Sequence, residues 1–174
     1  MFKHQLPRQN SLHEVQKIAY SPVNVLKHIS LGAPFICSGM LDNWPALRRW
    51  NPAYLSAKCA GNKVIVKDIK RNKKDICQFG EAMRVLQRQN QGEIENDVVI
   101  QMSQIKTGRY FSRSKPALEV LYDDIVLPKI IPHRRIVEIN FWAGSGGNVT
   151  ELHFDPLDNF LSLVSGNKNL SMIK

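Results

Sequence analysis

Hydrophobic residues recur along this chain at helical spacing in some stretches and at alternate positions in others. After Ser21, apolar residues return every three or four positions, which predicts a helix with Ser21 as its N-cap. The run PFICSGML predicts a short buried strand, and NWPALRRW after it predicts a turn. The polar residues 1–20 predict an extended lead-in with a short helix from Ser11.

The middle of the chain continues this mixture of helices and strands. NPAYLSAKCAG predicts a helix between Asn51 as cap and Gly61 as stop, and CQFGEAMRVLQRQNQG predicts one that ends near Gly92. KVIVKDI and DVVIQMSQI alternate as strands do. KRNKKD is the densest basic run and predicts a solvated loop. KPALEVLYDDIVLPKIIP predicts a helix followed by an extended, proline-bounded link.

From Arg135 onward the pattern becomes strand-like. RIVEINFWAG predicts a strand, GSGG a glycine turn, and NVTELHFDPLDNFLSLVSGNKNLSMIK alternates again. This order predicts an α+β fold in which a helix-rich N-terminal part leads into β structure. We expect one domain over residues 1–174, with a lead-in at 1–30, an α/β part at 31–134 and strands at 135–174.

Composition narrows the class of protein without selecting a partner. Of the 174 residues, 43% are hydrophobic and 22% charged, which is typical of a globular protein. The net charge of +9 favours an anionic partner, whether nucleic acid, an anionic surface or an acidic substrate. The three cysteines lack a CxxC motif and fit reduced, intracellular thiols. Without an apolar run of membrane-spanning length or a signal-peptide region, we expect a cytoplasmic protein, or also a nuclear one in a eukaryote.

Two potential metal ligands lie in the last strand-like stretch. His153 and Asp155 are two residues apart, so in a strand both side chains would share one face. An imidazole and a carboxylate form a mixed N/O set that Fe(II) accepts, and a third ligand would complete a facial triad. The pair alone also fits a surface His and Asp, because such tripeptides occur by chance. Thr150, Asn159 and Lys168 surround it with groups that suit a cosubstrate bearing carboxylates.

The surrounding motif resembles a known family. INFWAGSGGNVTELHFDPLDNFLSLVSGNK closely resembles the iron-binding segment of the jumonji-C, cupin-like hydroxylases, which depend on Fe(II) and 2-oxoglutarate. APFICSGMLDNWPALRRWNPAYLSAKCAG resembles the N-terminal element of that family, and GRYFSRSKPALEVLYDDIVLP resembles the segment between the two. The resemblance touches most of residues 30–174. It implies that the α+β chain leads into an incomplete double-stranded β-helix, or jelly roll.

The resemblance also implies roles for individual residues. His153 and Asp155 match the first two iron ligands of the family. The residues that match its cosubstrate-binding and pocket-lining positions are Tyr110, Asn140, Thr150, Asn159 and Lys168. The Thr150 hydroxyl would form a hydrogen bond with 2-oxoglutarate, and the Lys168 ammonium would pair with the distal carboxylate of this cosubstrate. The implied reaction is hydroxylation of a protein side chain or an RNA base, with demethylation of histone lysine less favoured.

The third ligand of the family is a second His downstream of the Gly-x-Lys turn, and no residue of this sequence matches it. The remaining histidines, His4, His13, His28 and His133, precede the motif in helical or linker contexts that fit surface or packing roles. We therefore expect the chain to be the N-terminal part of a longer oxygenase and to be impaired or inactive alone.

Two other interpretations remain open. One is a non-catalytic cupin-like binding protein or pseudoenzyme that contacts nucleic acid through KDIKRNKKD and RRIVE. The other is a structural metal site in which His153 and Asp155 share an ion with a partner chain. The sequence leaves the oligomeric state and the prime substrate undetermined.

Overall fold

The computed structural model describes residues 14–95, 97–108 and 115–172. Two compact units divide the chain between Met40 and Leu41. Among the described residues, no helix has both the length and the apolar character needed to cross a membrane.

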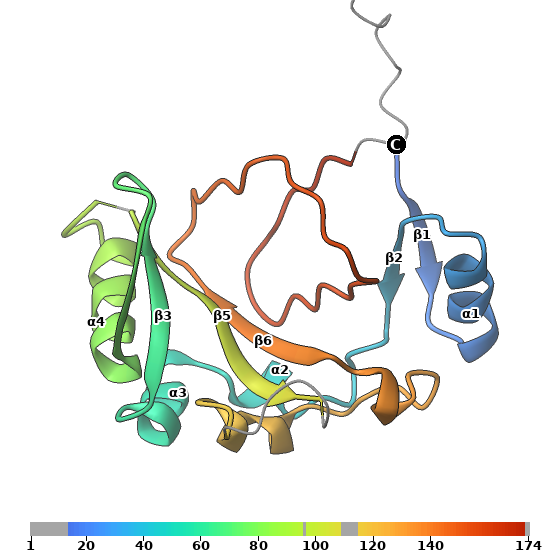
Figure 1. The fold of residues 1–174 in the computed structure, drawn as a ribbon, viewed down its shortest axis with the longest axis horizontal. Helices are drawn as coiled ribbons and strands as arrows, with labels where there is room; N and C mark the ends of the chain where they lie inside the picture. Colours follow the sequence, from blue (N-terminus) through green and yellow to red (C-terminus); the bar gives the residue numbers. More distant parts are fainter. Residues whose placement is uncertain (1–13, 96, 109–114, 173–174) are drawn as a thin grey trace, which may run out of the picture. The chain divides into compact units, whose positions relative to one another are not determined.

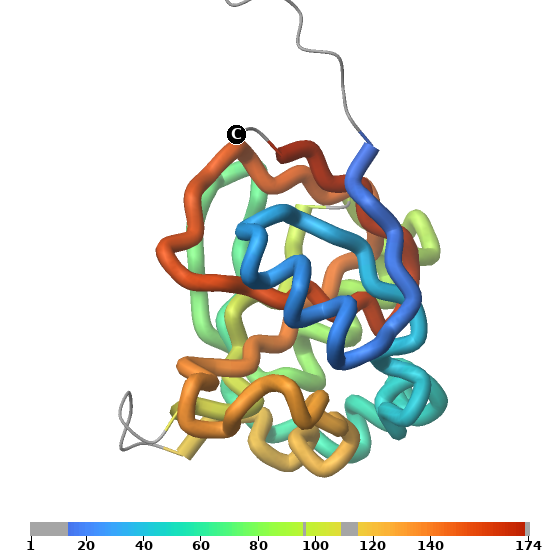
Figure 2. Tube along the Cα trace, turned by 90° about the vertical axis from the view of Figure 1, so that its right-hand side faces the viewer, coloured from blue at the N-terminus to red at the C-terminus, as the bar shows by residue number. Residues whose placement is uncertain are grey.

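The first unit contains a pair of parallel strands and one helix (Figure 1), and its trace is the blue part of Figure 2. Its elements are β1 (Gln16–Ala19), α1 (Pro22–Ser30) and β2 (Phe35–Ser38). The predicted cap is confirmed, because the side chain of Ser21 accepts a hydrogen bond of 3.1 Å from the backbone N–H of Asn24. His28 connects the three elements: its Nε2 lies 3.0 Å from Gln16 Oε1 and its ring packs on Phe35.

The second unit is built on a four-stranded antiparallel sheet of order β4-β3-β5-β6 (Figure 1). Its strands are β3 (Lys63–Asp68), β4 (Lys73–Gln78), β5 (Val98–Thr107) and β6 (Glu138–Ala143). The predicted strands at KVIVKDI, DVVIQMSQI and RIVEINFWAG are thereby confirmed. Mixed helices and an antiparallel sheet agree with the α+β class.

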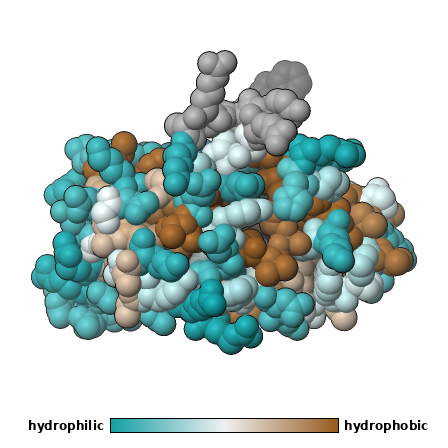
Figure 3. Space-filling view, turned by 90° about the horizontal axis from the view of Figure 1, so that it is seen from below, coloured by the Kyte–Doolittle hydropathy of each residue, from teal (hydrophilic) through white to brown (hydrophobic). Residues whose placement is uncertain are grey.

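The helices of this unit are short except for one. They are α2 (Ala46–Arg49), α3 (Pro52–Cys59), α4 (Phe79–Asn90) and the 3₁₀ helices η1 (Glu119–Asp124) and η2 (His133–Arg135). Asn51 caps α3 as predicted, with its Oδ1 2.9 Å from the backbone nitrogen of Tyr54. Seen from below, the surface at the α3 and α4 end is mostly hydrophilic (Figure 3).

The hydrophobic core lies between α3, α4 and one face of the sheet. Phe141 of β6 packs against both Phe79 and Trp50, with ring centroids 5.8 and 5.6 Å apart respectively. Aromatic rings in such tilted contacts contribute beyond their buried area. The strand that leads to the candidate metal motif is therefore fixed by the centre of the core.

A buried carboxylate joins η1 to the helices before the sheet. Asp124 is 1% exposed and accepts hydrogen bonds from Arg49 Nη1 at 2.8 Å, Trp50 Nε1 at 3.0 Å and the Tyr54 hydroxyl at 2.7 Å. Burial alone would raise the pKa of Asp124, but these three donors outweigh it and hold the pKa below its ordinary value. Nearby, Trp44 Nε1 donates to the carbonyl oxygen of Val126.

Four local predictions are wrong. Residues Gln16–Ala19 form a strand, where a lead-in with a helix from Ser11 was expected. NWPALRRW contains the helix α2, and KPALEVLYDD forms a 3₁₀ helix where an α-helix was expected. KRNKKD supplies a turn and the start of β4, because Lys73–Gln78 pairs along the whole of β3. Strand pairing decided the first and last of these cases, and periodicity alone does not report it.

A fifth error concerns residues 144–172, which contain no helix or strand (Figure 1). The alternation had predicted strands here, as the first strands of a jelly roll. A strand requires backbone hydrogen bonds to a neighbouring strand, and no described residue pairs with this segment. The described residues therefore contain no second sheet of a jelly roll.

Candidate metal and cosubstrate site

The segment that carries the candidate site leaves β6 through a tight glycine turn. Gly146 and Gly147 have φ values of +101° and +69°, a region in which glycine is favoured over other residues. A Cβ added at Gly144 would lie 2.4 Å from Asn148 Oδ1, so the Asn148 side chain would have to move to admit one. Gly146 and Gly147 thus let the chain turn away from the sheet immediately before the metal motif.

The structure brings the two predicted ligands together. His153 Nε2 lies 3.8 Å from Asp155 Oδ1, with the two side chains 58% and 53% exposed. Two metal–ligand bonds of about 2.1 Å each add up to more than this distance, so one ion can contact both atoms. The N/O donor set is the one Fe(II) accepts, so the residues fit the metal that the family implies.

Neighbouring groups orient both side chains. His153 Nδ1 lies 2.8 Å from the carbonyl oxygen of Glu151, and a proton on Nδ1 would leave Nε2 free for a metal. Asn159 Nδ2 donates a hydrogen bond of 3.3 Å to Asp155 Oδ2, the oxygen that does not face His153. The backbone contact of Glu151 carried no signal in the sequence, because it depends on the loop conformation.

Among the described residues, no third ligand lies next to this pair. Within the described ranges, no group of three His, Cys, Asp or Glu residues could hold a metal ion. His28 belongs to the first unit, and His133 lies in η2. His4 and His13 lie outside the described residues. The candidate site therefore consists of two ligands open to solvent.

The predicted cosubstrate residues are less closely gathered. Thr150 and Lys168 are exposed, and in the described part of the chain no hydrogen bond or ion pair joins either to His153 or Asp155. Asn140 is on β6, and its buried Oδ1 has no partner among the described residues. Such an acceptor can receive a hydrogen bond from a ligand. Tyr110 lies outside the described residues, so its role stays a prediction.

Comparisons with known proteins agree with the resemblance. The family described as "Cupin-like domain" matches residues 22–174. "Lysine-specific demethylase JMJ30" of Arabidopsis thaliana is 26% identical over 150 residues, covering 81% of this chain and 32% of the relative. "Lysine-specific demethylase 8" of Xenopus tropicalis is 24% identical over 78% of this chain and 30% of its own length.

A third relative covers more of its own length. "JmjC domain-containing protein E" of Dictyostelium discoideum is 24% identical over 168 residues, which are 84% of this chain and 48% of that protein. The chain thus spans between about a third and half of the length of these curated relatives.

Proposed function

The chain belongs to the cupin-like domain family, and from this premise we propose that it is part of an Fe(II)- and 2-oxoglutarate-dependent oxygenase acting on a protein side chain. The observation that carries the proposal is the 3.8 Å approach of His153 Nε2 to Asp155 Oδ1. The flanking contacts from Glu151 and Asn159 fix both ligands in an orientation suited to one ion.

The residues would divide the work of binding and orientation. His153 and Asp155 would hold Fe(II), and the Glu151 carbonyl would keep the proton on Nδ1 of His153. The Thr150 hydroxyl and the Lys168 ammonium would bind the two ends of 2-oxoglutarate, where a fixed cation suits a carboxylate. Asn140 Oδ1 would accept a hydrogen bond at the wall of the pocket. The bound iron and cosubstrate would supply the activation of O₂ by which oxygen enters a C–H bond.

The relatives support a protein as the substrate. Two of those described above are named lysine-specific demethylases. When an N-methyl group is hydroxylated, the methyl group is lost. When a carbon of the side chain is hydroxylated, the hydroxyl group stays on the product. One oxidation chemistry therefore gives both outcomes. We propose side-chain hydroxylation as the reaction of this chain. An RNA base remains the alternative substrate, to be distinguished by assay.

The decisive experiment is an anaerobic titration of this chain with Fe(II) and 2-oxoglutarate, followed by the visible charge-transfer band of such complexes. Because these residues supply two of three family ligands, we expect weak binding that 2-oxoglutarate strengthens. His153→Ala should remove the band, whereas His133→Ala, in η2, should leave it unchanged. A band of equal strength in the His153→Ala variant would refute the metal assignment.

The cosubstrate assignment has its own control. Lys168→Ala should raise the 2-oxoglutarate concentration needed for half of the band about tenfold, as expected for loss of a hydrogen bond to a charged group. Lys129→Ala, which removes an exposed lysine elsewhere in the same unit, should have no effect. An unchanged requirement in the Lys168→Ala variant would remove Lys168 from the site.

The exposure of the motif favours a second candidate function. A pair of ligands more than half exposed, with no third one among the residues that the structure describes, is also what a non-catalytic cupin-like binding protein would retain. In that case the titration would show no band that depends on 2-oxoglutarate with any variant.

A further inference from the structure

One face of the four-stranded sheet lies opposite the helices. Val64 of β3 and Cys77 of β4 pack into the core, on the side of α3 and α4. Side chains alternate along a strand, so their neighbours project from the other side of the sheet. We call this side the open face. On the β3–β4 hairpin it carries Lys63, Ile65, Lys67, Lys74 and Ile76.

The cations on the open face of the hairpin are not neutralised. Lys67 and Lys74 are direct partners in the β3–β4 register, and like charges in such a pair are destabilising. In the described part of the chain no ion pair reaches Lys63, Lys67 or Lys74. Asp68 and Asp75 alternate to the other face with Val66.

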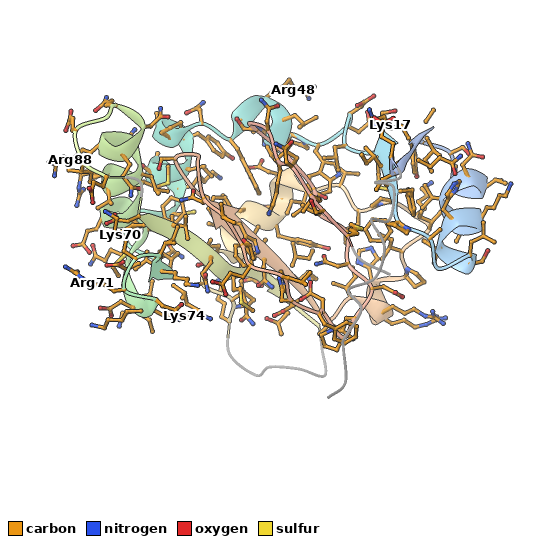
Figure 4. All side chains as sticks on the ribbon, turned by 90° about the horizontal axis from the view of Figure 1, so that it is seen from above. Lys17, Arg48, Lys70, Arg71, Lys74 and Arg88 are labelled. Carbon is orange, nitrogen blue, oxygen red and sulfur yellow. The ribbon has the colours of Figure 1, made fainter. Side chains whose placement is uncertain are left out.

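The basic residues of the turn, and Lys73 at the start of β4, behave differently. Lys70 pairs with Glu95, Arg71 with Asp68 and Lys73 with Asp75. Figure 4 shows Lys70, Arg71 and Lys74 gathered on this hairpin. Because the turn cations are satisfied within the chain, the charge available for a partner lies on the open face.

The spacing of these lysines suits an extended polyanion. Lys63 and Lys67 are four residues apart on β3, about 13 Å at the rise of a strand, and Lys74 is on the next strand, about 4.8 Å away. A hollow of about 420 Å³ lies between Lys63 and Lys74 and reaches Gln101 and Gln104 on β5. Glu138 on its border accepts a hydrogen bond from Gln104.

An aromatic side chain lies on the same face. Phe141 is in the core, so its neighbour Trp142 projects from the open face, where it is 52% exposed. Ile76 on β4 is 65% exposed. Trp142 lies two strands from the lysines of β3 on this face. A large exposed aromatic ring on the same face as unpaired cations is the arrangement on which unpaired bases stack while the backbone follows the charge.

We propose that the open face binds single-stranded nucleic acid, with Lys63, Lys67 and Lys74 contacting phosphates and Trp142 stacking on a base. The exposed ring favours a single strand, because the bases of a duplex are already stacked on each other. The net charge of +9 supports an anionic partner. This binding does not require the proposed oxidation, and it needs neither iron nor 2-oxoglutarate.

The test is the fluorescence anisotropy of a labelled single-stranded oligouridylate titrated with the full 174-residue chain at several salt concentrations. The variant Lys63→Gln, Lys67→Gln, Lys74→Gln removes three phosphate contacts. Its salt dependence, the slope of log K against log salt, should be shallower by about 2. Between 50 and 200 mM salt, the original chain should therefore lose about 20-fold more affinity than the variant.

The matched control removes the same charge from other surfaces. Lys27→Gln, Lys58→Gln and Lys129→Gln change exposed lysines on α1, on α3 and after η1. This control should keep the original slope. Equal slopes for the two triple variants would overturn the proposal, since the binding would then depend only on net charge. Lys74→Gln alone gives a smaller change of the same sign and guards against a folding defect.

The proposed stacking of Trp142 on a base is tested by a separate measurement. Trp142→Leu should weaken binding to the single strand fivefold or more, the usual range for loss of a stacked base. Binding should also quench the tryptophan fluorescence of the original chain but not of this variant, because Trp44 is buried and Trp50 packs against the core. No quenching, or equal affinity for a polyglutamate peptide of the same charge, would refute a nucleic-acid face and indicate an acidic protein segment instead.

Discussion

Replacing Asp124 with Ala tests whether one buried carboxylate connects η1 to α2 and α3. Asp124 is 1% exposed and accepts hydrogen bonds from Arg49, Trp50 and Tyr54. Its removal leaves the indole N–H and the phenol O–H without their acceptor in a partly buried place. The Arg49 side chain is 57% exposed and can turn to solvent, so the loss of its ion pair with Asp124 contributes little to the destabilisation.

The expected destabilisation follows from these donors. A buried donor left without a partner costs about 1–3 kcal/mol. Two such donors give a decrease of about 2–5 kcal/mol in the free energy of unfolding at pH 7. Because small domains are stable by about 5–15 kcal/mol, the variant should fold but with a much smaller margin.

The effect should depend on pH in a defined direction. The folded state holds the pKa of Asp124 below its ordinary value, despite burial, through hydrogen bonds from Tyr54, Arg49 and Trp50. The stabilisation is therefore complete above about pH 4, the pKa of an unperturbed Asp, and is lost as pH falls through the lower folded value. The difference between Asp124→Ala and the original chain should shrink in that range.

Urea denaturation followed by tryptophan fluorescence at pH 7 and at decreasing pH measures this difference. Asp123→Ala is the matched control, because it changes the exposed neighbour on the same helix and should cost less than about 0.5 kcal/mol. A loss below about 1 kcal/mol for Asp124→Ala, or one that is the same at all pH values, would refute the reasoning.

Two further perturbations test the backbone and the core. Met102 has φ +45° at the irregularity of β5, so Met102→Gly should raise the free energy of unfolding by about 0.5–1 kcal/mol in the same denaturation assay. Asn72→Gly, at φ +49°, should raise it less, because Asn tolerates this region of φ. A lower free energy of unfolding for Met102→Gly would contradict this reasoning. Burial raises the pKa of the Cys59 thiol to about 11, so at pH 8 only about one molecule in a thousand carries the thiolate. Cys37 and Cys77 should therefore react first with a thiol reagent, as followed by mass spectrometry, and equal labelling of Cys59 in the folded chain would exclude its buried position.

The elements predicted best are those whose signals are local. Ser21 and Asn51 begin their helices where the sequence places them, because a cap depends on the residue itself and the first turn. The strand through Phe141 was also recognisable, since its alternation is that of a half-buried strand. The hairpin at Lys73–Gln78 was missed because its polar sequence KKDICQ becomes a strand only by pairing with β3.

The sequence by itself determined the residue types of the candidate site and their spacing, and through them the family to which the chain belongs. Tertiary structure decided the contacts that no spacing encodes. It brought His153 Nε2 near Asp155 Oδ1 within a loop, where a strand had been expected, and placed the Glu151 carbonyl behind the imidazole. It also set Lys63, Lys67 and Lys74 on the same side of the sheet as Trp142. Strand register depends on partners distant along the chain, and the conformation of the loop around His153 follows no periodic pattern, so a local pattern specifies neither.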